Sequence, residues 1–303
     1  MKATFKKIDG ILLLDKPLHI TSNSALQRVK RLFGAKKAGH TGSLDPLATG
    51  MLPVCFGEAT KVSQFLLDSD KHYQVEAKLG MQTTTGDAEG DVTGVQPIKN
   101  VTIEAIIAVL QRFTGKVQQI PPMFSAIKHQ GKPLYELARK GIEIERKPRT
   151  VQIHSLQFNT YADGIVHFTV HCSKGTYIRT LVTDIGEQLG CGAYVFALRR
   201  SAVSPYQQNT MYTLAELEHM HSQHGFNAIA QCLLPLDTSV QHLPMIKLSS
   251  SATFYVRMGQ AIRAPYIPTE GWVRIFADSG QFMGIGEVLP DGKLAPRRLV
   301  KIV

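Results

Sequence analysis

A fifteen-residue run, GHTGSLDPLATGMLP at positions 39–53, constrains the fold of this chain more than any other stretch. Its glycines and prolines favour sharp turns and leave few side chains to do chemistry. Asp45 precedes Pro46, a pairing typical of a helix N-cap followed by proline at the first helical position. A helix N-terminus also stabilises an ionised carboxylate. Asp45 is therefore open to two interpretations, a structural cap or a nucleophile held in place.

The same run excludes one common nucleotide-binding motif. A P-loop requires Gly-Lys-Ser or Gly-Lys-Thr at the close of its glycine run, and no such sequence follows here. A phosphate cradle of that kind is not expected.

Net charge indicates the kind of partner. The chain carries +10 at pH 7, which predicts attraction to polyanions, most simply nucleic acid, although a merely basic enzyme remains open. Residues 121–149 concentrate this charge and interleave it with Phe124 and Tyr135; the basic residues are Lys128, Lys132, Arg139, Lys140, Arg146, Lys147 and Arg149. Composition alone fits a solvated helical hairpin or a nucleic-acid clamp.

The length of the chain and the positions of its cysteines limit the class of protein to which it can belong. A chain of 303 residues predicts about two domains. The four cysteines are far apart and form no C-x-x-C pair, so we expect buried thiols in a reducing compartment. The apolar run at 11–14 is too short for a signal peptide, and no stretch approaches a membrane span. We expect a cytoplasmic protein.

Hydrophobic periodicity predicts a mixed chain of helices and strands. The expected strands are 10–14, 71–80, 151–161, 165–173 and 193–203, and the expected helices are 21–34, 57–69, 100–115, 175–190 and 213–221. A compact tail follows, with a helix near 250–258 and strands near 271–277, 281–289 and 292–302. The tail is predicted to be a small, mostly β domain.

Two segments suggest metal sites at first sight. The acidic turn at 83–94 fails as an EF-hand, because Val92 stands where glycine is required and Ile98 where glutamate is required. We expect a solvated hairpin loop there. The histidines at 219, 221 and 224 lack the H-E-x-x-H spacing. We expect a solvated helix end and no metal.

The segment GHTGSLDPLATGMLPVCFGEATK resembles the catalytic motif of the TruB family, bacterial tRNA pseudouridine synthases. Further segments resemble the family in the same order: KHYQVEAKLG, TTTGDAEGD, PPMFSAIKHQGKPLYELARKG, GTYIRTLVTDIGEQLG and LRRSAV. The resemblance implies an α+β pseudouridine synthase fold with a mixed, mostly antiparallel sheet. It implies a catalytic domain over 1–245, an RNA-clamp insertion at 121–149, and a β-rich PUA-like domain over 246–303.

The implied activity is the isomerisation of uridine to pseudouridine at position 55, in the T-arm loop of tRNA, by an aspartate acting on a flipped-out base. The base leaves the ribose at N1 and rejoins it through C5, so no cofactor is needed. The implied partner is tRNA, with no membrane, no obligate protein partner and a monomeric state. The main alternative is a non-catalytic chaperone that binds and folds tRNA; a guide-dependent scaffold is a third.

The resemblance also assigns roles to residues of the pocket. Asp45 takes the place of the family's catalytic aspartate, and Arg179 that of the arginine paired with it. Tyr73 matches the tyrosine that stacks on the target base. Tyr177 and Leu198 are expected to line the pocket beside it.

A second group is expected to touch the RNA. His40 matches the residue that fills the gap left by a flipped base, which offsets part of the unstacking cost. Backbone contacts are expected from a set of polar and basic residues: Lys16, Asn23, Lys61, Lys128 and Lys132.

Overall fold

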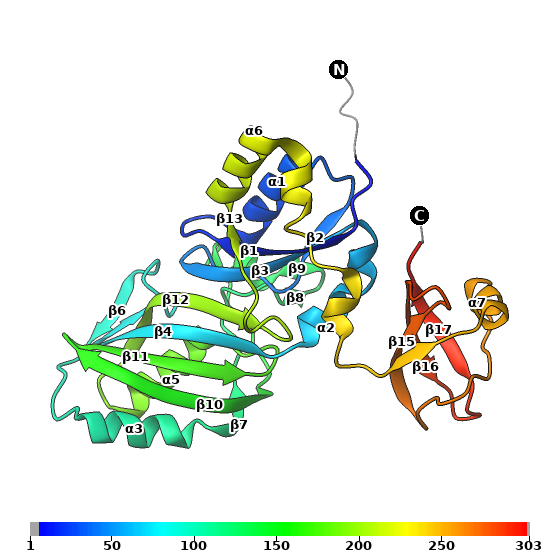
Figure 1. The fold of residues 1–303 in the computed structure, drawn as a ribbon. Coiled ribbons are helices and arrows are strands. Elements are labelled where there is room, and N and C mark those ends of the chain that lie inside the picture. The colour runs from blue at the N-terminus through cyan, green and yellow to red at the C-terminus, as the bar shows by residue number, and fades with distance from the viewer. Residues whose placement is uncertain (1–5, 302–303) are drawn as a thin grey trace. The chain divides into compact units, whose positions relative to one another are not determined.

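The computed structural model describes residues 6–301, which divide into two compact units (Figure 1). One unit consists of Asp45–Gly50 and Asp70–Val203, and the other contains the rest of the chain. The glycine- and proline-rich run therefore passes from one unit into the other. The predicted boundary between 245 and 246 falls inside the latter unit and stays a prediction.

The unit built on Asp70–Val203 is an antiparallel sheet in the order β12-β4-β11-β10-β7, with the first residues of β3 alongside β12 in parallel. Its elements are β4 (Lys71–Leu79), β5 (Met81–Thr83), β6 (Val92–Val95), α3 (Ile103–Arg112), β7 (Gly115–Gln119), β8 (Lys128–His129), β9 (Lys132–Pro133), α4 (Leu134–Ala138), β10 (Arg149–Ala162), β11 (Ile165–Cys172), α5 (Ile178–Gln188) and β12 (Ala193–Val203).

Alternation along these strands separates the two faces of the sheet. In β11, Val166, Phe168 and Val170 are buried, whereas the residues between them are only partly covered. Register places Val170 opposite Tyr73 of β4 and His171 opposite His72. Because successive side chains of a strand point to opposite faces, Tyr73 and His72 lie on different faces of the sheet.

The other unit holds a second part of the sheet, in the order β13-β1-β3 with β2 paired to β3, and a separate sheet in the order β14-β15-β16-β17. Its elements are β1 (Gly10–Lys16), α1 (Ser22–Leu32), β2 (Ala38–His40), β3 (Ala48–Phe56), η1 (Gly57–Lys61), α2 (Ser63–Asp68), β13 (Tyr212–Thr213), α6 (Leu214–Ala230), η2 (Leu236–Val240), β14 (Met245–Lys247), α7 (Ser250–Arg257), β15 (Gly271–Phe276), β16 (Phe282–Val288) and β17 (Leu294–Leu299).

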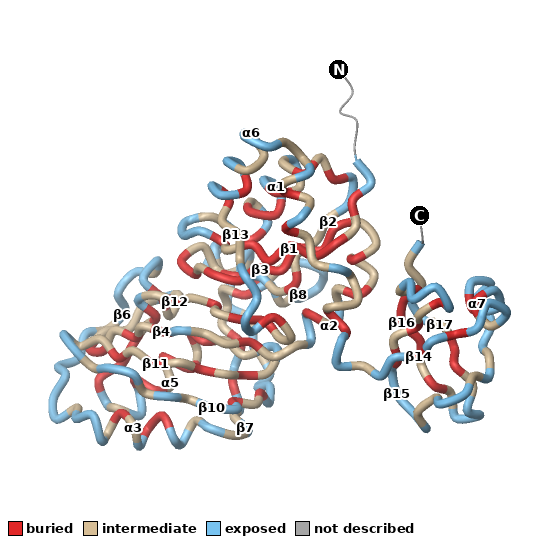
Figure 2. Tube along the Cα trace, viewed as in Figure 1, coloured by how far each residue is buried: buried red, intermediate tan, exposed pale blue. Residues whose placement is uncertain are grey.

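Among the described residues of this unit, the two larger cores appear as separate buried regions in Figure 2. Leu12, Val29 and Leu217 belong to the core between β1, α1 and α6. Val273 and Ile275 belong to the core of the C-terminal sheet. The described residues include no helix with the length and apolar character needed to span a membrane.

Helix starts follow the capping residues of the sequence. The Thr21 hydroxyl accepts a hydrogen bond from the Ser24 amide at 3.1 Å and begins α1. Thr213 and Glu216 form a reciprocal capping box at the start of α6. These side chains satisfy amides that have no partner within the helix.

The structure confirms most of the predicted elements and corrects several. Residues 57–69 divide into η1 and α2. Helix α6 is interrupted at Gly225, whose φ of 73° and ψ of −167° are not helical, so the histidines at 219, 221 and 224 lie at the end of its first part, as expected. Residues 121–149 form no helical hairpin, since they hold the β8–β9 hairpin and only the short helix α4. The last strand ends at Leu299; residue 302, at the end of its predicted range, lies outside the described residues. All four cysteines are buried free thiols, as expected.

Candidate active site

Asp45 does not begin a helix, which corrects the capping interpretation. Its carbonyl accepts a hydrogen bond from the Ala48 amide at 3.0 Å, and the chain turns directly into β3. Gly50, with φ of 101°, lies so close to β12 that a Cβ there would overlap the backbone oxygen of Arg200. The glycine therefore permits a close approach of two strands, and that approach fixes the turn carrying Asp45.

Arg179 is the main partner of the Asp45 carboxylate. It lies in the first turn of α5, and its side chain is only 5% exposed. Its Nε lies 2.9 Å from one carboxylate oxygen of Asp45, and its Nη2 donates to the other at 3.4 Å. Such a two-pronged contact keeps a carboxylate ionised and fixes its direction.

The remaining N–H groups of Arg179 hold the guanidinium in place. Nη1 donates to the Thr85 carbonyl at 2.9 Å, and Nη2 donates to the Phe124 carbonyl at 2.6 Å. Phe124 belongs to the basic segment 121–149, so that segment contacts the site through its backbone. The Asp45 side chain is 39% exposed, so part of it is accessible to a substrate.

Asp87 is a second carboxylate behind Arg179, and the sequence interpretation missed it. It is 3% exposed, and its Oδ2 lies 3.7 Å from Arg179 Nε. Its other oxygen accepts hydrogen bonds from the Thr85 hydroxyl and the Glu89 amide. The turn at 83–94 joins β5 to β6 as a hairpin, but it is not simply solvated, because Asp87 is buried against Arg179.

Tyr73 lies on β4 beside a second buried arginine. Arg200 on β12 is 1% exposed, stands opposite Tyr73 in the sheet register, and hydrogen-bonds to its phenol. Burial raises the pKa of the Tyr73 phenol, and the Asp45 carboxylate raises it further, while Arg200 opposes the shift. The phenol is therefore neutral at pH 7. No sequence pattern distinguished Arg200 from its neighbour Arg199.

Tyr177 and Leu198 complete the group that the structure brings together. Tyr177 directly precedes α5, and its backbone exchanges hydrogen bonds with the Gln119 side chain at 3.1 and 3.3 Å. Burial raises the pKa of the Tyr177 phenol, and Asp45 adds to that shift. Leu198 is 7% exposed and stands opposite Ala48, three residues after Asp45.

The residues expected to touch RNA fall in different settings. Lys16 is fully buried, and its ammonium donates to the carbonyls of Pro17 and Ile20, both at 2.8 Å. Since its charge is used inside the fold, Lys16 is unsuited to a phosphate contact, which corrects that expectation. Lys61 is partly exposed and bonds Glu58 at 2.6 Å and the Leu299 carbonyl at 2.8 Å.

The other predicted contact residues are accessible. Asn23 is exposed in the first turn of α1, and His40 is half-buried on β2 opposite Val54. Lys128 and Lys132 are exposed on the β8–β9 hairpin.

The sequence matches the models of known protein families over most of its length. Residues 30–178 match the model of the N-terminal domain of TruB family pseudouridylate synthases. Residues 179–241 match the C-terminal domain of tRNA pseudouridylate synthase B, and residues 244–300 match the C-terminal model of pseudouridine synthase II TruB.

Individual relatives align over nearly their full length. The chain is 54% identical over 298 residues to tRNA pseudouridine synthase B of Coxiella burnetii, covering 98% of this chain and 96% of the relative. It is 53% identical to the Pseudomonas fluorescens protein of the same name, covering 99% and 98%.

Solved structures with a similar fold include Cbf5 complexes. The chain resembles a chain in a Cbf5-Nop10-Gar1 complex with a TM-score of 0.74 and 27% identity, covering 97% of this chain and 84% of the other. An archaeal box H/ACA sRNP Nop10-Cbf5 complex gives 0.72 and 26%, covering 97% and 86%. These likenesses confirm the expected fold class, an α+β chain with a mixed sheet and a β-rich C-terminal part.

Proposed function

Because this chain belongs to the TruB family of pseudouridylate synthases, we propose that its target is the uridine at position 55, in the T-arm loop of tRNA. The chain is a tRNA pseudouridine synthase, since it aligns with tRNA pseudouridine synthases over nearly their whole length. The observation that carries the proposal is the half-exposed carboxylate of Asp45, held by the buried guanidinium of Arg179.

The reaction needs one reactive carboxylate and no redox partner. The N1–C1′ bond breaks, the base turns, a C5–C1′ bond forms, and the C5 proton leaves while N1 gains one. We propose Asp45 as the catalytic residue. It acts by addition to C6 of the base, by attack at C1′ of the ribose, or as the base at C2′ in a route through a glycal.

Neighbouring side chains supply binding and exclude water. We propose that Tyr73 stacks on the flipped base, a contact worth roughly 1–3 kcal/mol. Because its phenol is neutral, it serves as a hydrogen-bonding group and passes on a proton without carrying charge. Tyr177 and Leu198 contribute apolar surface, which strengthens electrostatic interactions in the pocket.

The target base must leave its stack before it can react. We propose that His40 fills the gap and that Asn23, Lys61, Lys128 and Lys132 contact the RNA backbone, without Lys16. Those contacts position the T-arm of the tRNA, whereas the folded shape and the unstacked bases of the T-arm supply specificity. The proposal includes a cytoplasmic monomer that acts without an obligate protein partner.

Release of tritium tests the proposal. The substrate is an unmodified tRNA transcript with C5-tritiated uridine, and the control transcript has cytidine at position 55. We expect the wild type to release about one tritium per tRNA from position 55, and Asp45→Asn to release none while still binding, because the amide cannot act as nucleophile or base. Release from another position would overturn the T-arm assignment. Binding without release by either protein would favour the chaperone alternative.

A further inference from the structure

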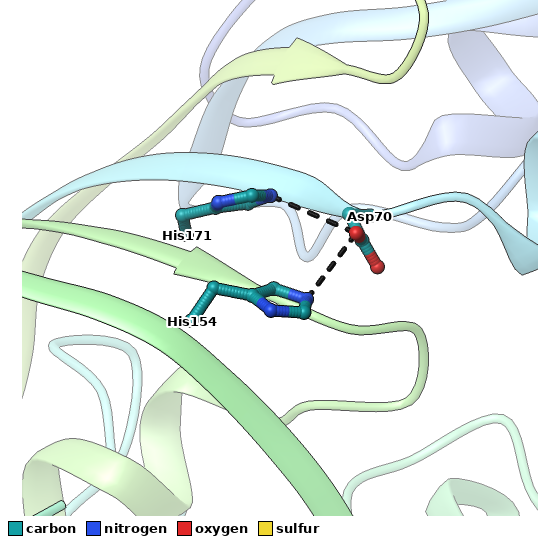
Figure 3. A group of neighbouring side chains, drawn as sticks. All are labelled: Asp70, His154 and His171. Atoms are coloured by element: carbon teal, nitrogen blue, oxygen red, sulfur yellow. Dashed lines mark ion pairs between the residues drawn. The ribbon is translucent and has the colours of Figure 1, made fainter. Parts of the chain in front are cut away.

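Three polar side chains, those of Asp70, His154 and His171, gather at one end of the sheet in the unit built on Asp70–Val203 (Figure 3), and the ring of a fourth, His72, stacks on that of His171. Asp70 lies immediately before β4, His72 lies on β4, His154 on β10 and His171 on β11. These three strands are neighbours in the sheet. Residues separated by up to 101 positions in the sequence thus lie close together in the fold. No short sequence motif predicts such a cluster.

A β-bulge in β10 places His154 beside His171. Ile153 pairs with Cys172, and Ser155 pairs with His171, so His154 is the extra residue of the bulge. Bulges redirect a side chain relative to the regular sheet. The imidazole rings of His154 and His171 lie 4.5 Å apart between centroids.

His171 is held from its other side by His72. The two rings stack at 4.0 Å with an angle of 9° between their planes, and the residues face each other across β4 and β11. This stack fixes the plane of the His171 ring.

The carboxylate of Asp70 completes the arrangement. Its Oδ2 lies 3.2 Å from His154 Nε2 and 3.7 Å from His171 Nε2 (Figure 3). One ligand atom from each of the three residues lies within 4.8 Å of the others. Zinc bonds of 2.0–2.2 Å in a tetrahedron place two ligand atoms about 3.4 Å apart. Both distances to Asp70 Oδ2 are close to this value.

The cluster is open to an entering ion. The side chains of Asp70 and His154 are 38% and 36% exposed, and that of His171 is 28% exposed. We propose that Asp70, His154 and His171 bind one divalent transition-metal ion of the zinc type, with His72 as a positioning residue. Two imidazoles and one carboxylate are a recognised zinc ligand set, and the fourth position is left to water.

The proposed metal lies away from the catalytic residues. His72 and Tyr73 are consecutive on β4, so their side chains point to opposite faces of the sheet. The ion joins the start of β4 to β10 and β11 and takes no part in the isomerisation. We therefore expect it to stabilise the fold, since a ligand that binds only the native state raises the free energy of unfolding.

Zinc alone is the probe for the first experiment. Untagged full-length protein is stripped with a chelator and titrated with ZnCl₂ by calorimetry, and thermal melts are recorded with and without zinc. We expect one zinc per chain and a higher melting temperature with zinc. His154→Ala and His171→Ala should abolish both effects, and His72→Ala should weaken binding about tenfold or more, as loss of a supporting side chain does.

His167→Ala is the matched control. His167 lies on β11, on the same face as His171 and 3.9 Å from the Glu76 carboxylate, but outside the cluster. It should bind zinc as the wild type does. Asp70→Asn keeps the size and the acceptor oxygen of the side chain and guards against loss of folding; it too should weaken zinc binding. No zinc binding by the wild type, or equal binding by His154→Ala, would overturn the proposal and leave the cluster as Asp–His ion pairs.

Discussion

At the scale of single residues, Arg179 organises the candidate active site, because one guanidinium contacts the Asp45 carboxylate and two backbone carbonyls. Arg179→Lys keeps the charge but loses the planar fork, so the Asp45 carboxylate is no longer aimed. We expect turnover to fall about 100-fold, the effect of a small misplacement of a reacting group. Binding of tRNA should change little. Single-turnover tritium release and filter binding measure the two quantities, and a loss confined to binding would contradict this role for Arg179.

We expect Asp87 to act on the chemistry through Arg179, whose Nε lies 3.7 Å from Asp87 Oδ2. Asp87→Asn removes the charge that faces the guanidinium and retains the size of the side chain. We expect kcat to fall about tenfold with an unchanged KM, because the aim of Asp45 is disturbed and the RNA contacts are not. The control is Asp91→Asn, an exposed carboxylate of the same hairpin. Equal activity of the two variants would show that Asp87 has no positioning role.

At the scale of elements, α5 contains a carboxylate in an unfavourable setting. Burial, and to a lesser extent the Glu187 charge, raises the pKa of Asp184 to about 6. The folded state therefore binds this proton more tightly than the unfolded state, and the resulting stability is complete below pH 3.8 and is lost as the pH rises through 6. Asp184→Asn removes the penalty. We expect it to raise the free energy of unfolding by about 1 kcal/mol at pH 8, after allowance for partial exposure, and to give little gain at pH 4. Urea unfolding at both pH values measures this difference, and an equal gain at both would rule out ionisation as its cause.

The basic segment 121–149 is the element whose charge bears on tRNA binding. We expect simultaneous replacement of Lys128, Lys132, Lys140 and Lys147 by Gln to weaken binding and to reduce the slope of log K against log salt. Each lost phosphate contact lowers that slope by about 0.7–0.9. Lys99→Gln with Lys116→Gln is the control, since both lysines are exposed outside the segment. An unchanged slope in the fourfold variant would exclude a clamp.

At the scale of the whole molecule, the sequence predicted the helices and strands more reliably than the burial and the contacts of individual side chains. Strong alternation along β4 and β11 and capping residues such as Thr21 and Thr213 are local signals, and the structure confirms the elements that they predicted. Asp87 was missed because its burial depends on Arg179, which is distant in the chain. Lys16 was misjudged because its acceptors are carbonyls of a turn that no composition reveals.

The same long-range packing attaches the C-terminal sheet to the rest of its unit. Val62, Val240 and Ile285 form a small buried cluster, with Phe65 packed against it. Two polar contacts lie nearby: Lys61 donates to the Leu299 carbonyl at 2.8 Å, and the Lys301 amide donates to Glu58 at 2.6 Å. Val62 itself lies outside the C-terminal sheet, so its truncation weakens the attachment without altering the core of that sheet.

The single tryptophan reports on that attachment. Trp272 lies on β15, with its ring 5.7 Å from that of Phe65. In the wild type we expect tryptophan fluorescence and far-ultraviolet circular dichroism to melt together. Val62→Ala removes about 2 kcal/mol of packing and should move the fluorescence transition to a lower temperature than the dichroism transition. Val29→Ala, in the core around α1, should leave the two curves coincident. Curves already separate in the wild type would mean that the C-terminal sheet melts independently of its neighbours.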